Sequence, residues 1–345
     1  MSCQRTIHKP GSWIKLTLVL LAALITFGLF QLTGLTFFSD VFVWFPDGRI
    51  QKVSPSENGL YYQPQINPDG TQVVFFGNET GSPRIWKADI ASGEVIALTP
   101  PDVGARQPAF SWDGSQIVFA SDMNSGQEHE RVEQMHGNGK PPGDLVVNLF
   151  VMDADGRNIR QVTSGQYQDQ RPTFSPDGKT IVFVSNRNGG MRLWSIPVEG
   201  GVEPRPLQST GWGYRPCFST DGQWIFFFTN VNGRHRISRM PVEGGKIIPL
   251  LNDDRGTSHG PFADPGGEFL LMHSTRGGKW GIWMLPLDGS PARPMQPPGF
   301  EEAFHASRAK NGVIAFDVSR RKWVRIAASW VYRRIFSLIP GDKDF

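Results

Sequence analysis

Six polar or cationic side chains recur where repeated segments begin, and they are the residues with which this chain could bind a ligand. They are Gln63, Gln107, Arg171, Arg215, His259 and His305. Arginine presents a planar pair of donors that matches a carboxylate. The set therefore predicts a site for a peptide end or another acidic group. The alternative is that each arginine only pairs with a carboxylate of a neighbouring repeat.

A second interpretation uses the imidazoles of the same set. His259 and His305, helped by Gln63 and Gln107, could hold a divalent cation, because neutral imidazole nitrogen binds such metals. No histidines stand at the H-x-x-x-H or H-E-x-x-H spacing of a helical metal site. Simple polar lining of a channel is therefore favoured, and no cofactor is expected.

A polar insert covers residues 122–145 and interrupts the repeats. Insertions in repeat proteins often lie on a binding face, although a solvated surface loop is the simpler interpretation. Four residues of this insert have spacing similar to that of the oxygen ligands in a calcium-binding loop: Asp122, Asn124, Glu128 and Glu133. Gln127 stands where such a loop needs glycine for its sharp turn. Specific calcium binding is therefore disfavoured.

The pentapeptide Gly256-Thr257-Ser258-His259-Gly260 fits the G-x-S-x-G pattern of a hydrolase nucleophile. That elbow needs a strand before it and a helix after it. Here it lies between two repeats and leads into a predicted strand, so we interpret the match as chance. No catalytic residue is predicted.

The elements that must position these residues are repeats. Their anchor positions are 64, 108, 172, 216, 261 and 304, with spacings of 44, 64, 44, 45 and 43 residues. Each unit joins an Asp-Gly type turn, a strong hairpin signal, to a β-branched and aromatic run typical of a buried strand. Repeats of about 40–45 residues with four short strands are typical of propeller blades.

The sequence predicts an all-β fold, a six-bladed propeller of four-stranded blades over residues 41–318. Residues 41–53 match 149–162 and lack the first two strands of a unit. Residues 303–318 supply those two strands, so both chain ends are expected to close the last blade. Closure leaves few unpaired strand edges.

Segments such as Ser175-Pro176-Asp177-Gly178, followed by Ile181-Val182-Phe183, resemble the WD40-like (PD40) repeats of the TolB family. The resemblance covers about 41–318 and implies a six-bladed, periplasmic propeller that acts as a binding scaffold. The chain departs from that family in lacking the α/β domain that precedes the propeller, so membership of the Tol system is not carried over. Related units occur in prolyl-oligopeptidase-type propellers and in oligogalacturonate-lyase-like proteins.

The N-terminal residues predict a membrane anchor. Residues 1–15 carry three basic residues and no acid, and residues 16–38 carry no charge. Such a run is long enough to span a bilayer as a helix, and the preceding positive charges place the N-terminus in the cytoplasm. We expect an uncleaved signal anchor in the bacterial inner membrane, single-pass, with the propeller facing the periplasm. A cleaved signal peptide is the alternative.

The C-terminal residues 320–345 are basic and contain two tryptophans. Trp323, Ile326, Ala327 and Trp330 follow helical spacing. This pattern predicts an amphipathic helix, either lying on an anionic membrane surface or packed under the propeller.

The formal net charge is +3, and no basic stripe or nucleic-acid motif is present, so nucleic-acid binding is disfavoured. The leading prediction is a non-enzymatic, membrane-anchored propeller that binds a protein or peptide partner of the cell envelope at its channel mouth. The alternative is a metal-dependent lyase or hydrolase acting on acidic oligosaccharides. A third interpretation is a structural scaffold at the membrane surface.

Overall fold

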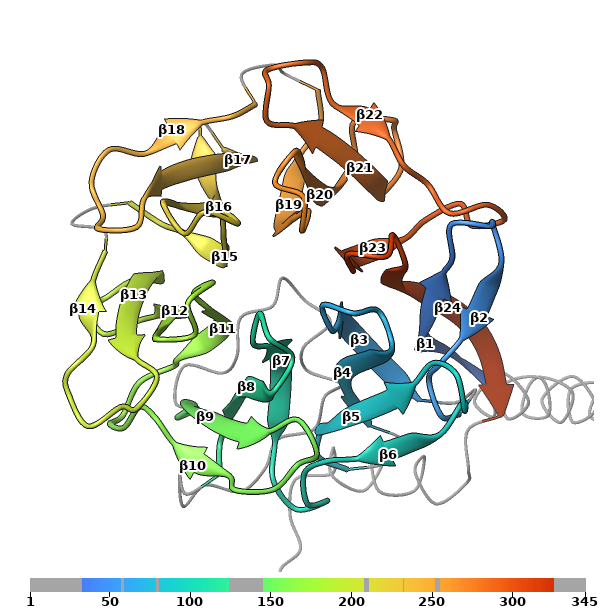
Figure 1. The fold of residues 1–345 in the computed structure, drawn as a ribbon. Helices are drawn as coiled ribbons and strands as arrows, with labels where there is room; N and C mark the ends of the chain where they lie inside the picture. The colour runs from blue at the N-terminus through green and yellow to red at the C-terminus, as the bar shows by residue number, and fades with distance from the viewer. Residues whose placement is uncertain are drawn as a thin grey trace, which may run out of the picture. The chain divides into compact units, whose positions relative to one another are not determined.

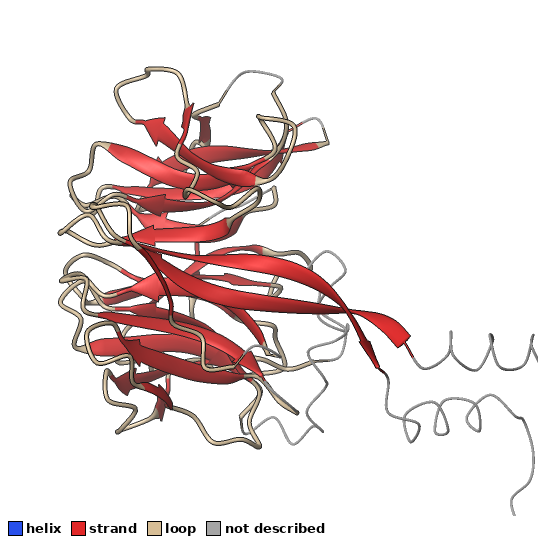
Figure 2. Ribbon diagram, turned by 90° about the vertical axis from the view of Figure 1, so that its right-hand side faces the viewer, coloured by secondary structure: helices blue, strands red, loops and turns tan. Residues whose placement is uncertain are grey.

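The computed structural model describes residues 33–56, 59–78, 81–123, 145–207, 211–231, 233–251 and 255–325. Every regular element in these ranges is a β-strand (Figure 2). Contacts divide the chain into a compact unit, Phe38–Ser319, and a second unit made of Met1–Phe37 and Arg320–Phe345. The first unit holds the predicted site.

Four separate sheets have four strands each and follow the repeats in order. The first contains β7 (Ala105–Phe110), β8 (Gln116–Ser121), β9 (Asn148–Asp153) and β10 (Arg160–Gln161). The second contains β11 (Gln170–Phe174), β12 (Thr180–Ser185), β13 (Arg192–Pro197) and β14 (Arg205–Pro206). The third contains β15 (Tyr214–Phe218), β16 (Trp224–Val231), β17 (Arg234–Pro241) and β18 (Ile248–Pro249). The fourth contains β19 (Ser258–Ala263), β20 (Phe269–Ser274), β21 (Gly281–Pro286) and β22 (Arg293–Pro294).

A fifth sheet has eight strands and unites the two ends of the described chain. It contains β1 (Thr33–Trp44), β2 (Ile50–Lys52), β3 (Leu60–Ile66), β4 (Gln72–Asn78), β5 (Arg84–Asp89), β6 (Val95–Ala97), β23 (Phe304–Arg308) and β24 (Ile314–Arg325). β24 lies next to β1, and β2 pairs with β1. Early and late strands thus share one sheet, as the repeats predict.

The prediction of six separate four-stranded blades is wrong. Only four sheets of the described chain are self-contained blades, because β1 also bridges to β3 in parallel, at Ser39 and Leu60. The amide of Ser39 donates to the carbonyl oxygen of Gly59 at 3.2 Å. β1 begins at Thr33, well before the predicted start of the propeller at residue 41, and this added length reaches the start of β3.

The predicted transmembrane helix over residues 16–38 is also not borne out. In the part of the chain that the structure describes, no helix is long and apolar enough to cross a membrane. The end of the predicted span lies in β1 instead. This part of β1 contains phenylalanine and threonine, which suit strands.

The predicted C-terminal helix begins inside a strand, because β24 continues to Arg325. Trp323, the first residue of the expected helical face, is therefore extended. Residues 1–32 and 326–345, which carry the rest of both terminal predictions, lie outside the described residues.

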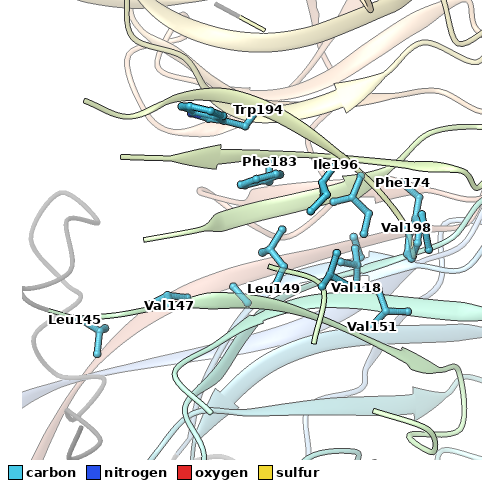
Figure 3. Close-up of a cluster of buried hydrophobic side chains, with 14 residues drawn as sticks. Val118, Leu145, Val147, Leu149, Val151, Phe174, Phe183, Trp194, Ile196 and Val198 are labelled. Carbon is cyan, nitrogen blue, oxygen red and sulfur yellow. The ribbon is translucent and has the colours of Figure 1, made fainter. Parts of the chain in front are cut away.

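The sheets stand around a central axis, and β3, β7, β11, β15, β19 and β23 face it (Figure 1). Each of these innermost strands contacts the next, and β23 contacts β3. Apolar side chains fill the space between neighbouring sheets. In one such cluster, Val118 and Leu149 from one sheet meet Phe174, Phe183 and Trp194 from the next (Figure 3). Full burial of each such side chain contributes about 1.5–3 kcal/mol to folding.

The hairpin between the two innermost strands of a sheet follows one hydrogen-bonding pattern. Ser175 Oγ donates to Asp177 Oδ1 at 2.5 Å, and it accepts the Thr180 amide at 3.0 Å. Gly178 supplies the positive φ, 69°, that the turn needs. Ser111 with Asp113 and Ser219 with Asp221 repeat the arrangement. The turn thereby fixes where each innermost strand ends.

Candidate functional site

Every innermost strand contains a bulge at the same place. The pairing register shifts between Tyr62 and Gln65, and at the equivalent place in the other five strands. One residue in each bulge has a left-handed backbone, with φ between 48° and 58°: Gln63, Gln107, Arg171, Arg215, Gly260 and His305. Such a conformation is uncommon for residues other than glycine. Bulges of this kind redirect a side chain, and strained residues cluster at ligand sites.

His259 does not occupy the position equivalent to that of the other five predicted residues. Gly260 does, and a Cβ there would lie 2.9 Å from His273 Cε1 and 3.0 Å from Arg215 Nη1. Glycine thus lets the backbone approach both side chains closely. His259 precedes the register shift and pairs with His273 on the neighbouring strand.

The bulges open into a central cavity of about 180 Å³. Five of the six predicted residues line it, namely Gln63, Gln107, Arg171, Arg215 and His305, and His259 does not. Prolines and apolar side chains of the innermost strands line the rest, as far as Pro68 and Lys310. The cavity therefore combines a polar, cationic zone at the bulges with a largely apolar wall.

Of the three arginines that line this cavity, Arg308 pairs with Asp264, whereas Arg171 and Arg215 have no ionic partner among the described residues. Among the described residues, neither guanidinium forms an ion pair with a carboxylate, so the alternative interpretation of neighbouring ion pairs is not met. Arg171 stacks over Tyr214, with its Cζ 5.5 Å from the ring centroid, and its Nε is buried without a hydrogen bond. Burial, together with the nearby charge of Arg171, lowers the pKa of Arg215 well below its usual value. Two half-buried guanidinium groups that act on each other electrostatically favour an anion beside them.

One buried carboxyl group lies near the arginines. Asp317 is 1% exposed and accepts hydrogen bonds from the Gln63 amide at 3.1 Å and from His305 Nδ1 at 2.7 Å. Burial raises the pKa of Asp317 to about 7, although the Gln63 amide and the two arginines act in the opposite direction. Asp317 therefore changes charge near neutral pH, which an ordinary aspartate does not do.

Histidines extend from this carboxyl group on the side of the bulges away from the cavity. The ring of His305 lies 4.7 Å from that of His273, and the ring of His273 lies 5.4 Å from that of His259. His259 Nε2 and His235 Nδ1 share a hydrogen bond at 2.5 Å. Burial lowers the pKa of His259 to about 3 and holds the pKa values of His273 and His305 well below 6.5. These imidazoles are neutral at pH 7.

The imidazoles do not fit the divalent cation of the alternative interpretation. His305 Nδ1 is engaged by Asp317, and His259 Nε2 is engaged by His235. In the described ranges no group of three or more His, Cys, Asp or Glu side chains is arranged to hold a metal ion. The two guanidinium groups in the same cavity also oppose a cation.

Of the predicted calcium residues in the insert, only Asp122 is described. It is buried, pairs with Arg106 Nη2 at 3.1 Å and accepts the Gly104 amide at 2.8 Å. Its carboxylate is thus committed to the sheet. Asn124, Glu128 and Glu133 lie outside the described residues.

Two nucleophilic side chains near the axis are not activated. Ser258 begins β19 and is fully buried, with its Oγ hydrogen-bonded to Ser274 Oγ at 2.9 Å. This strand context differs from a hydrolase elbow. Cys217 lines the cavity, but burial raises the pKa of its thiol to about 12. The thiol therefore stays protonated and is a poor nucleophile.

The sequence interpretation missed Asp317 and His273, although a signal was present. Both stand on the second strand of their sheets, opposite the residue that precedes the bulge. The equivalent position carries an apolar residue in the other four repeats, namely Phe76, Ala120, Val184 and Phe228. An ionisable residue at a position that is apolar in the other repeats indicates a candidate functional site.

Comparison with known proteins supports the fold. Residues 143–307 match the family described as the TolB beta propeller domain, PD40. A TolB homolog from Chlorobium chlorochromatii is 30% identical over 141 residues, covering 34% of this chain and 32% of the relative. The Tol-Pal system protein TolB of Bordetella pertussis is 26% identical over 155 residues, covering 45% of this chain and 31% of the relative. The chain thus spans about a third of the length of these curated relatives.

Solved structures agree on the fold alone. A TolB candidate from Agrobacterium tumefaciens superposes with a TM-score of 0.65 at 16% identity, covering 83% of this chain and 99% of the other. An oligogalacturonate lyase from Vibrio parahaemolyticus gives a TM-score of 0.53 at 11% identity, covering 81% of each chain. Similarity at this level reaches both a TolB-like protein and an enzyme, so the site residues must decide between functions.

Proposed function

Since the chain belongs to the TolB-like family of PD40 propellers, we propose that it is a non-enzymatic binding protein of the bacterial periplasm. Its partner is a protein or peptide of the cell envelope, which inserts an acidic segment into the central cavity. The carrying observation is the pair of arginines at the bulges, Arg171 and Arg215, which line this cavity without an ionic partner among the described residues.

Several features support binding over catalysis. The cavity wall beyond the arginines contains prolines and apolar side chains, which suit an inserted peptide. Ser258 and Cys217 are not activated as nucleophiles. The Bordetella relative bears the name of an envelope system, which favours a partner in the same compartment.

Site-specific photocrosslinking in cells tests the proposal. A photoreactive residue at Lys310, exposed on the cavity rim, should crosslink one defined envelope protein. The same residue at Val202, exposed on a turn in another part of the propeller, should not. Replacing Arg171 and Arg215 together by glutamine should abolish the crosslink from position 310. Equal crosslinking from both positions, or a crosslink that survives the double substitution, would overturn the proposal.

A further inference from the structure

We infer that the cationic end of the cavity is a site for a single organic carboxylate, and that Asp317 takes up a proton when this carboxylate binds. The inference rests on the proposed function, because it names the group through which the partner is recognised. It concerns a small, buried part of the cavity, and a free carboxylic acid can therefore probe it without the partner.

A donor for an anion is already in place. Arg171 Nε is buried and without a hydrogen bond in the structure. Arg171 and Arg215 both line the cavity, and neither forms an ion pair among the described residues. A buried donor without a partner costs free energy. A bound anion would relieve that cost where two guanidinium groups meet.

The chemistry of the cavity wall favours an organic carboxylate. Arg171 and Arg215 supply positive charge at the bulges without an ion-pair partner among the described residues. The prolines and apolar side chains in the rest of the wall suit the organic body of a carboxylate rather than free phosphate. A planar carboxylate also matches the fork of a guanidinium group.

The groups around Asp317 explain the proton uptake. On β3, the Gln63 amide donates a hydrogen bond to Asp317, and Tyr62 also faces this carboxyl group. On β23, His305 is hydrogen-bonded to it. The positive charges of Arg171 on β11 and Arg215 on β15 act on it electrostatically. His273 and His259 on β20 and β19 stand behind His305 and are neutral. A second negative charge beside Asp317 raises the pKa of this carboxyl further, because like charges disfavour ionisation.

The consequence for affinity has a definite sign. The ligand binds more tightly to the form in which Asp317 is protonated, so affinity falls as pH rises through the pKa of Asp317. Each unit by which the ligand raises that pKa corresponds to about a tenfold ratio between the low-pH and high-pH affinities. The imidazoles cannot supply this dependence near pH 7, because their pKa values lie far below it.

Calorimetry of the purified full chain tests the inference. The probes are N-acetyl-L-alanine, which mimics a peptide C-terminus, and N-acetyl-aspartate methylamide, which mimics an acidic side chain. N-acetyl-L-alaninamide is the uncharged control. We expect binding of at least one acid and not of the amide, with about tenfold higher affinity at pH 6 than at pH 9. Titration at pH 7.5 in two buffers of different ionisation enthalpy should show proton uptake.

Asp317→Asn keeps the acceptor oxygen and removes the titration. This variant should bind the acid with no dependence on pH and no proton uptake. Asp221→Asn, at an exposed hairpin turn, is the matched control and should behave like the parent chain. If Asp317→Asn does not fold, the two-buffer measurement on the parent chain still decides. Affinity that does not change with pH, proton uptake retained without Asp317, or equal binding of the amide would each overturn the inference.

The two proposals can fail separately. Loss of the crosslink from position 310 while the acid still binds would contradict the protein partner alone. A specific crosslink with affinity that does not change with pH would contradict the carboxylate inference alone.

Discussion

The hairpin turns and the bulges of the innermost strands are both repeated, but they use their side chains in opposite ways. At the turns, the same serine and aspartate recur in three repeats of the chain, and they form hydrogen bonds within the turn, as between Ser175 and Asp177. At the bulges, the six repeats share the same backbone conformation, with φ near 55°, but the residue there differs: glutamine, arginine, glycine or histidine. The turns therefore serve as scaffold, and the bulges present different chemistry into one cavity.

The largest expected effect is on binding. Replacing Arg171 and Arg215 by glutamine should weaken carboxylate binding by about 100-fold or more, since removing buried charged partners of an anion costs about 2–5 kcal/mol. The midpoint of urea unfolding should stay equal or rise, because two half-buried cations that repel each other are removed. Calorimetry and urea unfolding measure the two quantities. A variant that binds normally would show that the bulges, like the turns, are scaffold.

The next effect separates the two regions by pH. Between pH 6.5 and about 4, the unfolded chain gains protons on His259, His273 and His305 that the folded chain does not accept. Asp317 has the opposite effect on stability, because in this pH range the folded chain binds a proton on Asp317 that the unfolded chain does not. Net uptake by the unfolded chain means that stability falls as pH falls through this window, by about 1–3 kcal/mol per pH unit.

Thermal unfolding across pH 4–7 measures this loss. Asp317→Asn should steepen it, because the opposing proton disappears. The turn aspartates, Asp113, Asp177 and Asp221, have pKa values lowered mainly by serine hydrogen bonds. The stability that these aspartates contribute is fully present above about pH 3.8, the usual pKa of aspartate. It is lost only as the pH falls from that value through their lowered pKa values. A melting temperature that stays constant between pH 6.5 and 4 would contradict the assigned states of the imidazoles.

A third effect concerns the one glycine among the bulges. Gly260→Ala should lower the free energy of unfolding by about 1–3 kcal/mol, because the added Cβ meets His273 and Arg215. Gly178→Ala, at a turn with positive φ and open space, is the matched control and should cost less, about 1 kcal/mol. Urea unfolding compares them. Equal losses would show that backbone strain alone, and not the close approach, requires glycine at position 260.

The smallest effect is at a turn. Ser175→Ala removes the hydroxyl that links Asp177 and the Thr180 amide. We expect a loss of about 1 kcal/mol in the free energy of unfolding and no change in carboxylate affinity, because the turn does not line the cavity. A change in affinity as large as that of the arginine variants would mean that the turns and bulges are not separable.

Much of the fold could be predicted from local pattern. The Asp-Gly turns and apolar runs recur often enough to identify the strands, the repeat length and the joining of both chain ends. Five of the six predicted site residues line one cavity, and the sequence shows their equivalence because proline or alanine follows each at a fixed distance from its turn. In the fourth sheet the equivalent residue is Gly260 and not His259. Glycine has no side chain, so a search for polar side chains selected its neighbour.

Other predictions failed where neighbours decide the outcome. The division into separate blades depended on a single bridge between Ser39, which precedes the predicted propeller, and Leu60, which lies inside it. The apolar run before residue 41 is compatible with both helix and strand, and pairing with a distant strand selects the latter for β1. The pairing of β1 with β24 joins residues hundreds of positions apart in the sequence.

The strands and turns follow from the amino-acid sequence, because hairpin turns and strand runs are specified by residues within a few positions of one another. The repeats also place two arginines at equivalent positions of successive units. Folding brings these arginines into the wall of one cavity, near the carboxyl group of Asp317 from the far end of the chain. Charge and burial act through space, so the state of a titratable group depends on neighbours that sequence spacing does not reveal.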